Sequence, residues 1–251
     1  MPAERIKKTR VVIIGCGFAG SACLGALSRR PDLFSVTVID KKSHFEFLPL
    51  LPDVVGRGIP AEILGADIEK ICSERQAAYI RGEVGGIDRE LKEVIVPGRG
   101  NVPFDYVVIA CGVKTNYYGN ADIMRQSSSL RTVADARAIL RAAREADYDS
   151  FVISGGGYTG IEIATHLKRF FARQGRRKKI VIIEKKDSIL GPLPEWMKTY
   201  TEDNLRHMEI ETLRNAAVTR RQGEKVMLDN GTVFDKAFLI WVAGTRGVCL
   251  A

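Results

Sequence analysis

Hydrophobic positions along this chain follow a pattern that occurs twice. Residues 11–14 (VVII) and 151–154 (FVIS) are short runs rich in β-branched or aromatic residues, and each passes directly into the glycine pattern GxGxxG. Runs of this length and composition are typical of buried strands. After the glycines, residues 21–30 and 161–173 have the spacing of apolar positions that predicts a helix. The sequence therefore predicts two copies of a strand, a glycine turn and a helix.

Each predicted helix leads to a second apolar strand that ends in an acidic residue. The strands VTVID and IVIIE end at Asp40 and Glu184, which follow the last glycine of their motifs by about 20 residues. This is close to the spacing of a βαβ unit that binds a dinucleotide. Further on, residues 104–112 (FDYVVIACG) match residues 234–244 (FDKAFLIWVAG), each a strand that stops at a small residue and glycine. The repeat predicts an α/β fold with two Rossmann-like dinucleotide-binding domains.

Smaller elements are predicted between these parts. Residues 78–87 and 93–96, with the turn that follows, predict a small antiparallel meander in the first module, and residues 225–234 predict a hairpin in the second. Residues 116–130 are mainly polar and predict the link between the modules. Residues 132–146 predict an amphipathic surface helix.

The glycine patterns have a specific physical purpose. The first glycine permits the tight strand-to-helix turn, the second lets backbone N–H groups approach a pyrophosphate, and the third lets the helix pack closely on the sheet. The start of the helix then offers N–H donors and a positive dipole end to the phosphates. Asp40 and Glu184 would each accept hydrogen bonds from an adenosine ribose. The alternative is an α/β fold with the same turns that binds no nucleotide.

Composition and charge limit the other functions. The chain has 38 Lys and Arg against 30 Asp and Glu, so its net charge of +8 favours phosphates, anionic lipid or an acidic partner. No recognition motif for nucleic acid accompanies this charge, and nucleic-acid binding is not expected. No apolar run reaches the roughly 18 residues of a membrane-spanning helix. The short basic start leaves no room for a signal peptide before residue 11. A cytoplasmic location is therefore expected.

Cysteine and histidine spacings do not indicate a metal site or a redox pair. The cysteines are Cys16, Cys23, Cys72, Cys111 and Cys249, and the histidines are His44, His166 and His207. They form no CxxC or HExxH motif. The chain also contains no GxSxG elbow and no GxxxxGK[ST] loop, which excludes the hydrolase and P-loop classes that depend on those motifs.

The paired motifs resemble those of a known group of flavoproteins. These are the pyridine nucleotide oxidoreductases with two dinucleotide-binding domains and, within them, the type II NADH:quinone oxidoreductases, which are single-subunit enzymes that pump no protons. The resemblance covers nearly the whole chain. The segments that carry it are residues 15–20, 38–41, 44–51, 104–112, 115–119, 155–162 and 241–247.

The resemblance implies a domain organisation and an activity. FAD would be bound by a domain over residues 1–112, and NADH by a domain over residues 113–244 that is inserted in the first, with residues 245–251 starting the return. A hydride would pass from the nicotinamide to the flavin, and electrons would go on to a membrane quinone. The implied location is cytoplasmic, at the inner face of the membrane, and a homodimer is compatible with it.

Individual residues follow from the same resemblance. FAD binding is implied for Gly15, Gly17, Phe18, Ala19, Gly20, Asp40, Lys41, Pro49, Val84, Ala110 and Gly112. NAD binding is implied for Gly155, Gly157, Tyr158, Thr159, Gly160, Glu184, Ala243 and Gly244. Glu162 matches a family glutamate near the point where nicotinamide and flavin meet, and a catalytic role is implied for it. The alternative for Glu162 is an acid favoured by the dipole in the first turn of a helix.

The chain departs from the family pattern at two places. The family's Ala-Thr-Gly is Ala110-Cys111-Gly112 here. Family members also continue beyond the region that ends at Ala251, with a Gly-Asp motif that contacts the flavin and a C-terminal region that helps form the quinone site and attaches to the membrane. We therefore expect a truncated chain that holds FAD weakly. The alternatives are a flavoprotein like the sulfide:quinone oxidoreductases, which needs a reactive cysteine pair, and a non-catalytic nucleotide-binding remnant.

Overall fold

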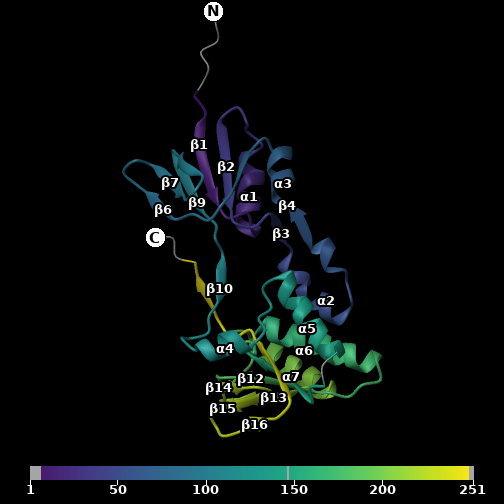
Figure 1. Ribbon diagram of the computed structural model, residues 1–251. Coiled ribbons are helices and arrows are strands. Elements are labelled where there is room, and N and C mark those ends of the chain that lie inside the picture. Colours follow the sequence, from purple (N-terminus) through teal and green to yellow (C-terminus); the bar gives the residue numbers. More distant parts are fainter. Residues whose placement is uncertain (1–6, 146, 249–251) are drawn as a thin grey trace, which may run out of the picture. The chain divides into compact units, whose positions relative to one another are not determined.

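The computed structural model describes residues 7–145 and 147–248, which form two compact units (Figure 1). The described part of the first unit comprises residues 7–46, 65–114 and 247–248. The second unit comprises Phe47–Leu64 and Thr115–Arg246. From the sequence, FAD binding is expected over residues 1–112 and NADH binding over residues 113–244. This division by cofactor stays a prediction. The contacts divide the chain differently, because residues 47–64 pack within the second unit.

A four-stranded parallel sheet forms the centre of the first unit. Its order is β5 (Ala78–Arg81), β2 (Phe34–Asp40), β1 (Thr9–Ile14) and β9 (Tyr106–Ile109). Alternate side chains of β1 point to opposite faces, so Val11 and Ile13 contribute to one core cluster and Val12 and Ile14 to another. Burial on both faces explains why residues 11–14 of this strand are all hydrophobic.

Different elements cover the two faces of this sheet. The cluster with Ile13 includes Leu24 of α1 (Phe18–Leu27) together with Ile68 and Cys72 of α3 (Ile68–Glu74). The opposite cluster includes Val94 and Val96 of an antiparallel meander. The strands of that meander are β6 (Gly86–Asp88), β7 (Glu93–Val96) and β8 (Gly100–Pro103), and a separate antiparallel pair is formed by β3 (His44–Glu46) and β4 (Gly65–Asp67). The expected meander is therefore present, but its expected first strand is wrong, because residues 78–81 are the parallel edge strand β5.

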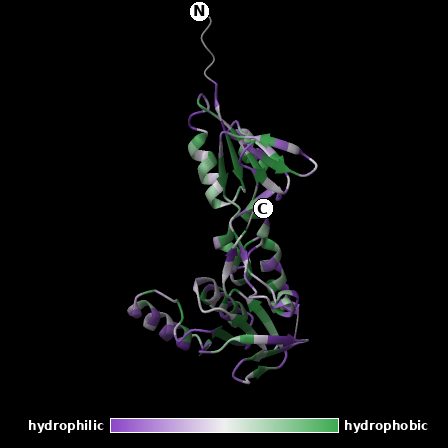
Figure 2. Cartoon of the chain, turned by 90° about the vertical axis from the view of Figure 1, so that its left-hand side faces the viewer, coloured by the Kyte–Doolittle hydropathy of each residue, from purple (hydrophilic) through white to green (hydrophobic). Residues whose placement is uncertain are grey.

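The second unit repeats this sheet. Its order is β13 (Glu211–Arg214), β12 (Lys179–Glu184), β11 (Ser150–Ser154) and β17 (Ala237–Trp241), again all parallel. Helices α5 (Val133–Glu145) and α6 (Tyr158–Arg173) contribute to the core cluster on one face. The antiparallel strands β14 (Val218–Gln222), β15 (Lys225–Leu228) and β16 (Val233–Phe234) contribute to the other cluster. In Figure 2 the sheet strands of each unit are coloured mainly as hydrophobic.

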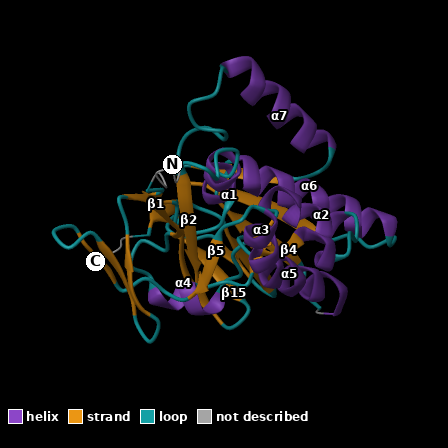
Figure 3. Cartoon of the chain, turned by 90° about the horizontal axis from the view of Figure 1, so that it is seen from above, coloured by secondary structure: helices purple, strands orange, loops and turns teal. Residues whose placement is uncertain are grey.

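The remaining elements complete the described chain. Figure 3 colours the helices purple and the strands orange. These remaining elements are the 3-10 turns η1 (Leu48–Leu50) and η2 (Ala61–Leu64), the helices α2 (Leu51–Gly56), α4 (Ala121–Gln126) and α7 (Glu195–His207), and the strands β10 (Val113–Thr115) and β18 (Thr245–Gly247). Over residues 7–145 and 147–248, no helix has both the length and the apolar character needed to cross a membrane.

The stretch expected as a link is part of the second unit. Asn120 caps α4 by accepting a hydrogen bond from the Ile123 N–H, and the Ile123 side chain is fully buried in the core. The buried Ile123 and the capping Asn120 thus hold α4 in the second unit, and Leu130 at the end of this mainly polar segment is buried as well.

Candidate dinucleotide-binding sites

The three glycines of the first unit's turn have two kinds of surroundings. Gly15 has a φ of +98°, and a Cβ there would lie 2.5 Å from the Ala110 carbonyl oxygen. A Cβ on Gly20 would lie 1.9 Å from the Gly15 oxygen. A Cβ on Gly17 would meet nothing within 4 Å. The first and third glycines therefore close the turn, and the second faces open space at the start of α1.

The second unit has the same arrangement. Gly155 has a φ of +118°, and a Cβ there would lie 3.0 Å from the Ala243 Cα. A Cβ on Gly160 would lie 1.9 Å from the Gly155 oxygen, whereas a Cβ on Gly157 would meet nothing within 4 Å. Gly17 and Gly157 are the N-caps of α1 and α6, and neither helix has a side-chain cap or an acidic residue in its first turn as the structure defines it. Both helix starts therefore present N–H donors to an anion.

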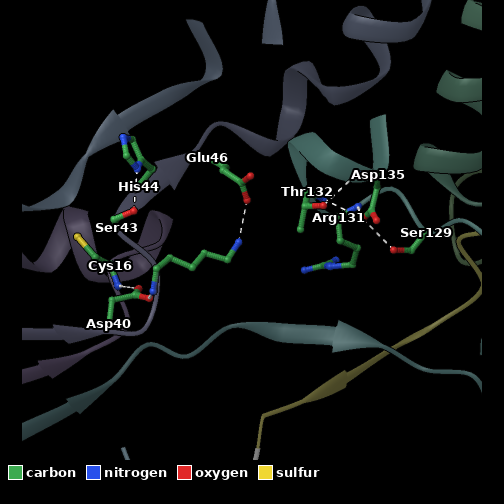
Figure 4. A network of polar contacts seen from close by, with 10 residues as sticks. Cys16, Asp40, Ser43, His44, Glu46, Ser129, Arg131, Thr132 and Asp135 are labelled. Atoms are coloured by element: carbon green, nitrogen blue, oxygen red, sulfur yellow. Dashed lines mark hydrogen bonds and ion pairs between the residues drawn. The ribbon is translucent and has the colours of Figure 1, made fainter. Parts of the chain in front are cut away.

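The strand-end acids are held against these turns by matching hydrogen bonds. Asp40 accepts from the backbone N–H of Cys16 at 2.7 Å and from that of Lys42 at 2.9 Å, and Figure 4 shows the contact with Cys16. Glu184 accepts from the backbone N–H of Gly156 at 2.7 Å and from that of Lys186 at 2.9 Å. Each carboxylate is thereby fixed at the carboxyl end of its sheet, where open α/β sheets bind ligands.

The remaining residues expected at the FAD site lie in several places. Phe18 and Ala19 form the exposed first turn of α1, and Ala110 donates its N–H to the Ile14 oxygen at 2.8 Å. Lys41 forms an ion pair with Glu83 at 2.8 Å, which raises the pKa of Lys41. Val84 is half-buried against the meander, and Gly112 has a φ of +68°. Pro49 belongs to η1 and therefore to the second unit.

The residues expected at the NAD site all belong to the second unit. Tyr158 and Thr159 are exposed in the first turn of α6, where Tyr158 is 61% exposed. Ala243 and Gly244 follow the end of β17. Ala243 lies beside Gly155. Gly244 has a φ of +81°, a backbone conformation that favours glycine, and it faces the Tyr118 hydroxyl. The structure thus gathers the glycine turn, Glu184 and Ala243 at one end of one sheet.

A cavity that the sequence did not indicate opens in the first unit. Its volume is about 360 Å³, and Ser43, Tyr79 and Arg81 are among the residues that line it. Arg81 lies opposite Asp40 in the register of β2 and β5. The Tyr79 hydroxyl donates to the Lys42 oxygen at 2.7 Å, and burial together with Asp40 raises the pKa of Tyr79. The cavity is therefore close to the end of the sheet that carries Asp40.

Glu162 occupies the start of α6 in a group of titratable residues that the sequence did not single out. Burial and then the charge of Asp53 raise the pKa of the Glu162 carboxyl. Asp53 is buried on α2, where Arg57 Nε lies 3.1 Å and His166 Nε2 lies 4.0 Å from its Oδ1. Burial lowers the pKa of His166. One feature of the sequence could have indicated part of this group: His166 follows Glu162 by four residues, which places both on the same face of α6.

Two cysteines that are far apart in the sequence lie together in the core of the first unit. Cys16 and Cys72 are both buried in the same core cluster. The interaction with Cys16 and burial raise the pKa of Cys72, which favours its protonated thiol. Cys111 donates its thiol to the Ile14 oxygen at 3.7 Å, and Cys249 lies outside the described residues. Within residues 7–145 and 147–248 there is no cluster of side chains that could hold a metal ion.

Two glycine turns, each beside a strand-end acid, define a protein with two Rossmann-like dinucleotide-binding modules. The family model described as pyridine nucleotide-disulphide oxidoreductase matches residues 9–250. The chain belongs to this family, which confirms the expected fold class.

Similar proteins include NADH dehydrogenases from distant organisms. The chain is 26% identical to the external NADH-ubiquinone oxidoreductase 2 of Saccharomyces cerevisiae mitochondria, over 98% of this chain and 51% of that protein. It is 27% identical to the type II NADH:quinone oxidoreductase NdhA of Mycobacterium tuberculosis, over 94% of this chain and 56% of that protein. The resemblance inferred from the motifs is confirmed by these relatives. The chain spans about half the length of the curated relatives it matches.

Solved structures share the fold. The NDH2 structure from Plasmodium falciparum in complex with NADH has a TM-score of 0.85 at 20% identity, over 97% of this chain and 56% of that one. The sulfide:quinone oxidoreductase of Aquifex aeolicus also has a TM-score of 0.85, at 22% identity, over 96% of this chain and 60% of that one.

Proposed function

We propose that this chain is the FAD- and NADH-binding part of a type II NADH:quinone oxidoreductase, which takes a hydride from NADH and passes electrons to a quinone. The observation that carries the proposal is the duplicated cradle, in which an open glycine lies at a helix start beside a fixed acid. The names of the relatives support NADH as donor and a quinone as acceptor. A quinone acceptor places the reaction at a membrane surface, where the net charge of +8 favours anionic lipid.

In this proposal the first unit binds FAD. The open position at Gly17 and the N–H groups at the start of α1 receive the pyrophosphate, and Asp40 binds the adenosine ribose. The described residues therefore fit the nucleotide end of the cofactor. When bound, FAD supplies a ring that accepts a hydride and passes the electrons on.

The second unit binds NADH in the same manner. The start of α6 at Gly157 receives the pyrophosphate, and Glu184 accepts hydrogen bonds from the ribose hydroxyls. A carboxylate held in this position repels the 2′-phosphate of NADPH, so we expect a preference for NADH. Glu162 then acts as the catalytic residue near the nicotinamide, where its carboxyl adjusts the local charge and carries a proton.

The proposal is tested with the purified chain incubated with FAD and then passed through a desalting column. We expect flavin absorbance that corresponds to less than one FAD per chain, because FAD is expected to be held weakly, and quenching of protein fluorescence when NADH is added. Gly17→Ala should weaken FAD binding with little effect on NADH, and Gly157→Ala should do the reverse, because each new Cβ occupies open space in only one unit. A folded chain that binds neither nucleotide would contradict the proposal and support the non-catalytic remnant.

A sulfide:quinone oxidoreductase is the second candidate, because a structure of that class shares the fold. It requires two reactive thiols beside the flavin. Among the described residues, Cys16 and Cys72 lie in one core cluster and are both buried, and the pKa of the Cys72 thiol is raised, which disfavours this chemistry. Flavin bleaching by sulfide in the absence of NADH would favour the second candidate.

A further inference from the structure

Positive charge is concentrated in one stretch of the second unit. Residues 163–183 contain seven Lys and Arg and no Asp or Glu, whereas the net charge of the whole chain is +8. This stretch includes most of α6 and of the strand β12 that follows it. Three more arginines, Arg137, Arg141 and Arg144, follow one another on α5 at the spacing of a single helix face. Helices α5 and α6 therefore carry much of the excess positive charge.

The C-terminal ends of α5 and α6 lie side by side. The Arg176 side chain, just beyond α6, donates from Nη1 to the Ala143 carbonyl oxygen of α5 at 2.8 Å. Helix α2 contacts both of them, and Figures 1 and 3 show the three helices together. The cations at the ends of α5 and α6 therefore belong to one surface of the second unit.

Ion pairs occupy two lysines of this surface but leave most of its arginines without an acid. Lys168 pairs with Glu209 at 3.0 Å, and Lys178 pairs with Asp147 at 3.7 Å. Glu145, at the end of α5, offsets one further charge. Over residues 7–145 and 147–248, the structure shows no ion pair for five exposed arginines, which we call the arginine face: Arg141, Arg144, Arg169, Arg173 and Arg177.

The helix dipole accounts for only part of the arginine face. Cations are favoured in the last turn of a helix, where Arg144 and Arg173 lie. Arg141 and Arg169 precede the last turns, and Arg177 follows the end of α6. Arg169 and Arg173 are like charges four residues apart, a spacing at which like charges destabilise a helix. An anionic partner would relieve this repulsion.

The composition of the arginine face favours a lipid surface over a protein or a nucleic acid. Guanidinium groups bind phosphate oxygens in a bidentate manner. Within the described part of the chain, no large exposed hydrophobic side chain lies on α5, or on α6 beyond Tyr158 at its start. Protein interfaces are centred on aromatic or apolar anchors, and single-stranded nucleic acid stacks on aromatic side chains. A layer of lipid phosphates requires only the positive charge.

We propose that the arginine face docks on an anionic phospholipid bilayer, and so gives the second unit a membrane contact of its own, separate from the attachment that the resemblance implies for a C-terminal region. This inference rests on the proposed function, in which electrons pass to a membrane quinone. Each Lys or Arg near an anionic bilayer strengthens binding about fivefold. The attraction decays over a Debye length of about 8 Å at physiological salt, so the position of a cation matters as well as the net charge.

The test is cosedimentation of the full chain with lipid vesicles. Vesicles of phosphatidylcholine and phosphatidylserine are compared with vesicles of phosphatidylcholine alone, at low and at high salt. We expect binding to the anionic vesicles only, and loss of that binding at high salt. A triple variant with Arg141→Gln, Arg144→Gln and Arg173→Gln should bind about 100-fold more weakly, since each lost charge contributes about fivefold.

The matched control removes three cations from the other side of the same sheet. Arg125 on α4, Arg220 on β14 and Lys225 on β15 are exposed, and their elements contribute to the core cluster on the face opposite α5 and α6. Replacing all three by Gln lowers the net charge by three, from +8 to +5, as the test variant does. Vesicle binding of this control should stay within about fivefold of that of the unmodified chain.

Circular dichroism checks the folding of every variant. If the test variant does not fold, Arg141→Gln and Arg173→Gln are measured singly, and each should weaken binding about fivefold. Unchanged binding in both single variants overturns the inference. It is also overturned if the unmodified chain does not bind anionic vesicles, or if the two triple variants lose the same affinity.

Two competitors distinguish the lipid from other polyanions. If polyuridylate or polyglutamate binds the chain more tightly than the vesicles do, and the test variant loses that binding, the arginine face belongs to a nucleic acid or an acidic protein and the inference is overturned. Vesicle binding is measured without FAD or NADH. Failure of nucleotide binding therefore contradicts the proposed function alone, and failure of vesicle binding in a chain that binds both nucleotides contradicts this inference alone.

Discussion

Replacement of the second and third glycines of the α6 turn should separate binding from folding. Gly160→Ala places a methyl group 1.9 Å from the backbone oxygen of Gly155, where real Cβ contacts are not found below 3.0 Å. Gly157→Ala places the same methyl group where nothing lies within 4 Å, at a φ of −81° that alanine readily adopts. The two variants add the same atoms to the same turn, so each is the control for the other.

Gly160→Ala should mainly lower stability, whereas Gly157→Ala should mainly lower the affinity for NADH. The clash at Gly160 is with backbone, so the helix must shift away from β11, and overpacking of this type costs about 1–3 kcal/mol or more. At about 2–4 °C per kcal/mol, this cost corresponds to a fall in Tm of about 2–12 °C. Gly157→Ala weakens an N-cap by about 1 kcal/mol at most. Its methyl group occupies the space that the pyrophosphate needs, so affinity for NADH should fall about tenfold or more, which corresponds to about 1.4 kcal/mol.

Differential scanning calorimetry of both variants, with NADH titrated by protein fluorescence, provides the two measurements. Gly20→Ala and Gly17→Ala repeat the comparison in the first unit, where the same clash of 1.9 Å and the same open position occur. The reasoning is refuted if Gly157→Ala binds NADH as well as the unmodified chain does, or if Gly160→Ala leaves Tm unchanged.

Three further predictions follow from the same geometry. Glu184→Gln should narrow the preference for NADH over NADPH, since the charge that repels a 2′-phosphate is lost; equal ratios of the two dissociation constants before and after the change would argue against this role. The hydrogen bond from Arg10 lowers the pKa of Asp105 to about 2, so its contribution to stability is present above about pH 4 and is lost as pH falls towards 2. Urea unfolding should therefore show Asp105→Asn to be less stable than the unmodified chain at pH 6, with a difference that shrinks as pH falls towards 2, and a difference as large at pH 2 as at pH 6 would contradict this. Cys111→Ser should leave stopped-flow flavin reduction by NADH within a few-fold of the unmodified rate in the FAD-loaded protein, because its thiol is bonded to the Ile14 oxygen; loss of reduction with FAD still bound would favour a thiol mechanism.

Local pattern was sufficient for the repeated modules. The strands at residues 11–14 and 151–154 are buried on both faces, and such strands are continuous apolar runs that can be recognised without knowing their neighbours. The glycine turns and the acids at Asp40 and Glu184 are equally local, because they occur at fixed distances along a βαβ unit. For these parts, the expected elements agree with the structure.

Elements whose position depends on distant partners were assigned less well. Residues 78–81 alternate like a meander strand, and only their parallel pairing with β2 makes them an edge of the main sheet. Residues 116–130 are polar on average, and α4 is stabilised there because the Ile123 side chain is buried in the core of the second unit. In both cases the deciding interaction is with residues far away in the sequence.

The sequence by itself determined the duplicated α/β architecture, the two glycine turns and the acids that stand beside them, because each depends on residues within one βαβ unit. Only the tertiary structure decided that Cys16 and Cys72 lie in one buried cluster, and that Oδ1 of Asp53 on α2 lies 4.0 Å from Nε2 of His166 on α6. No spacing rule links such pairs, since the segments that carry them are brought together by burial of apolar side chains, which is non-directional and leaves no local signature.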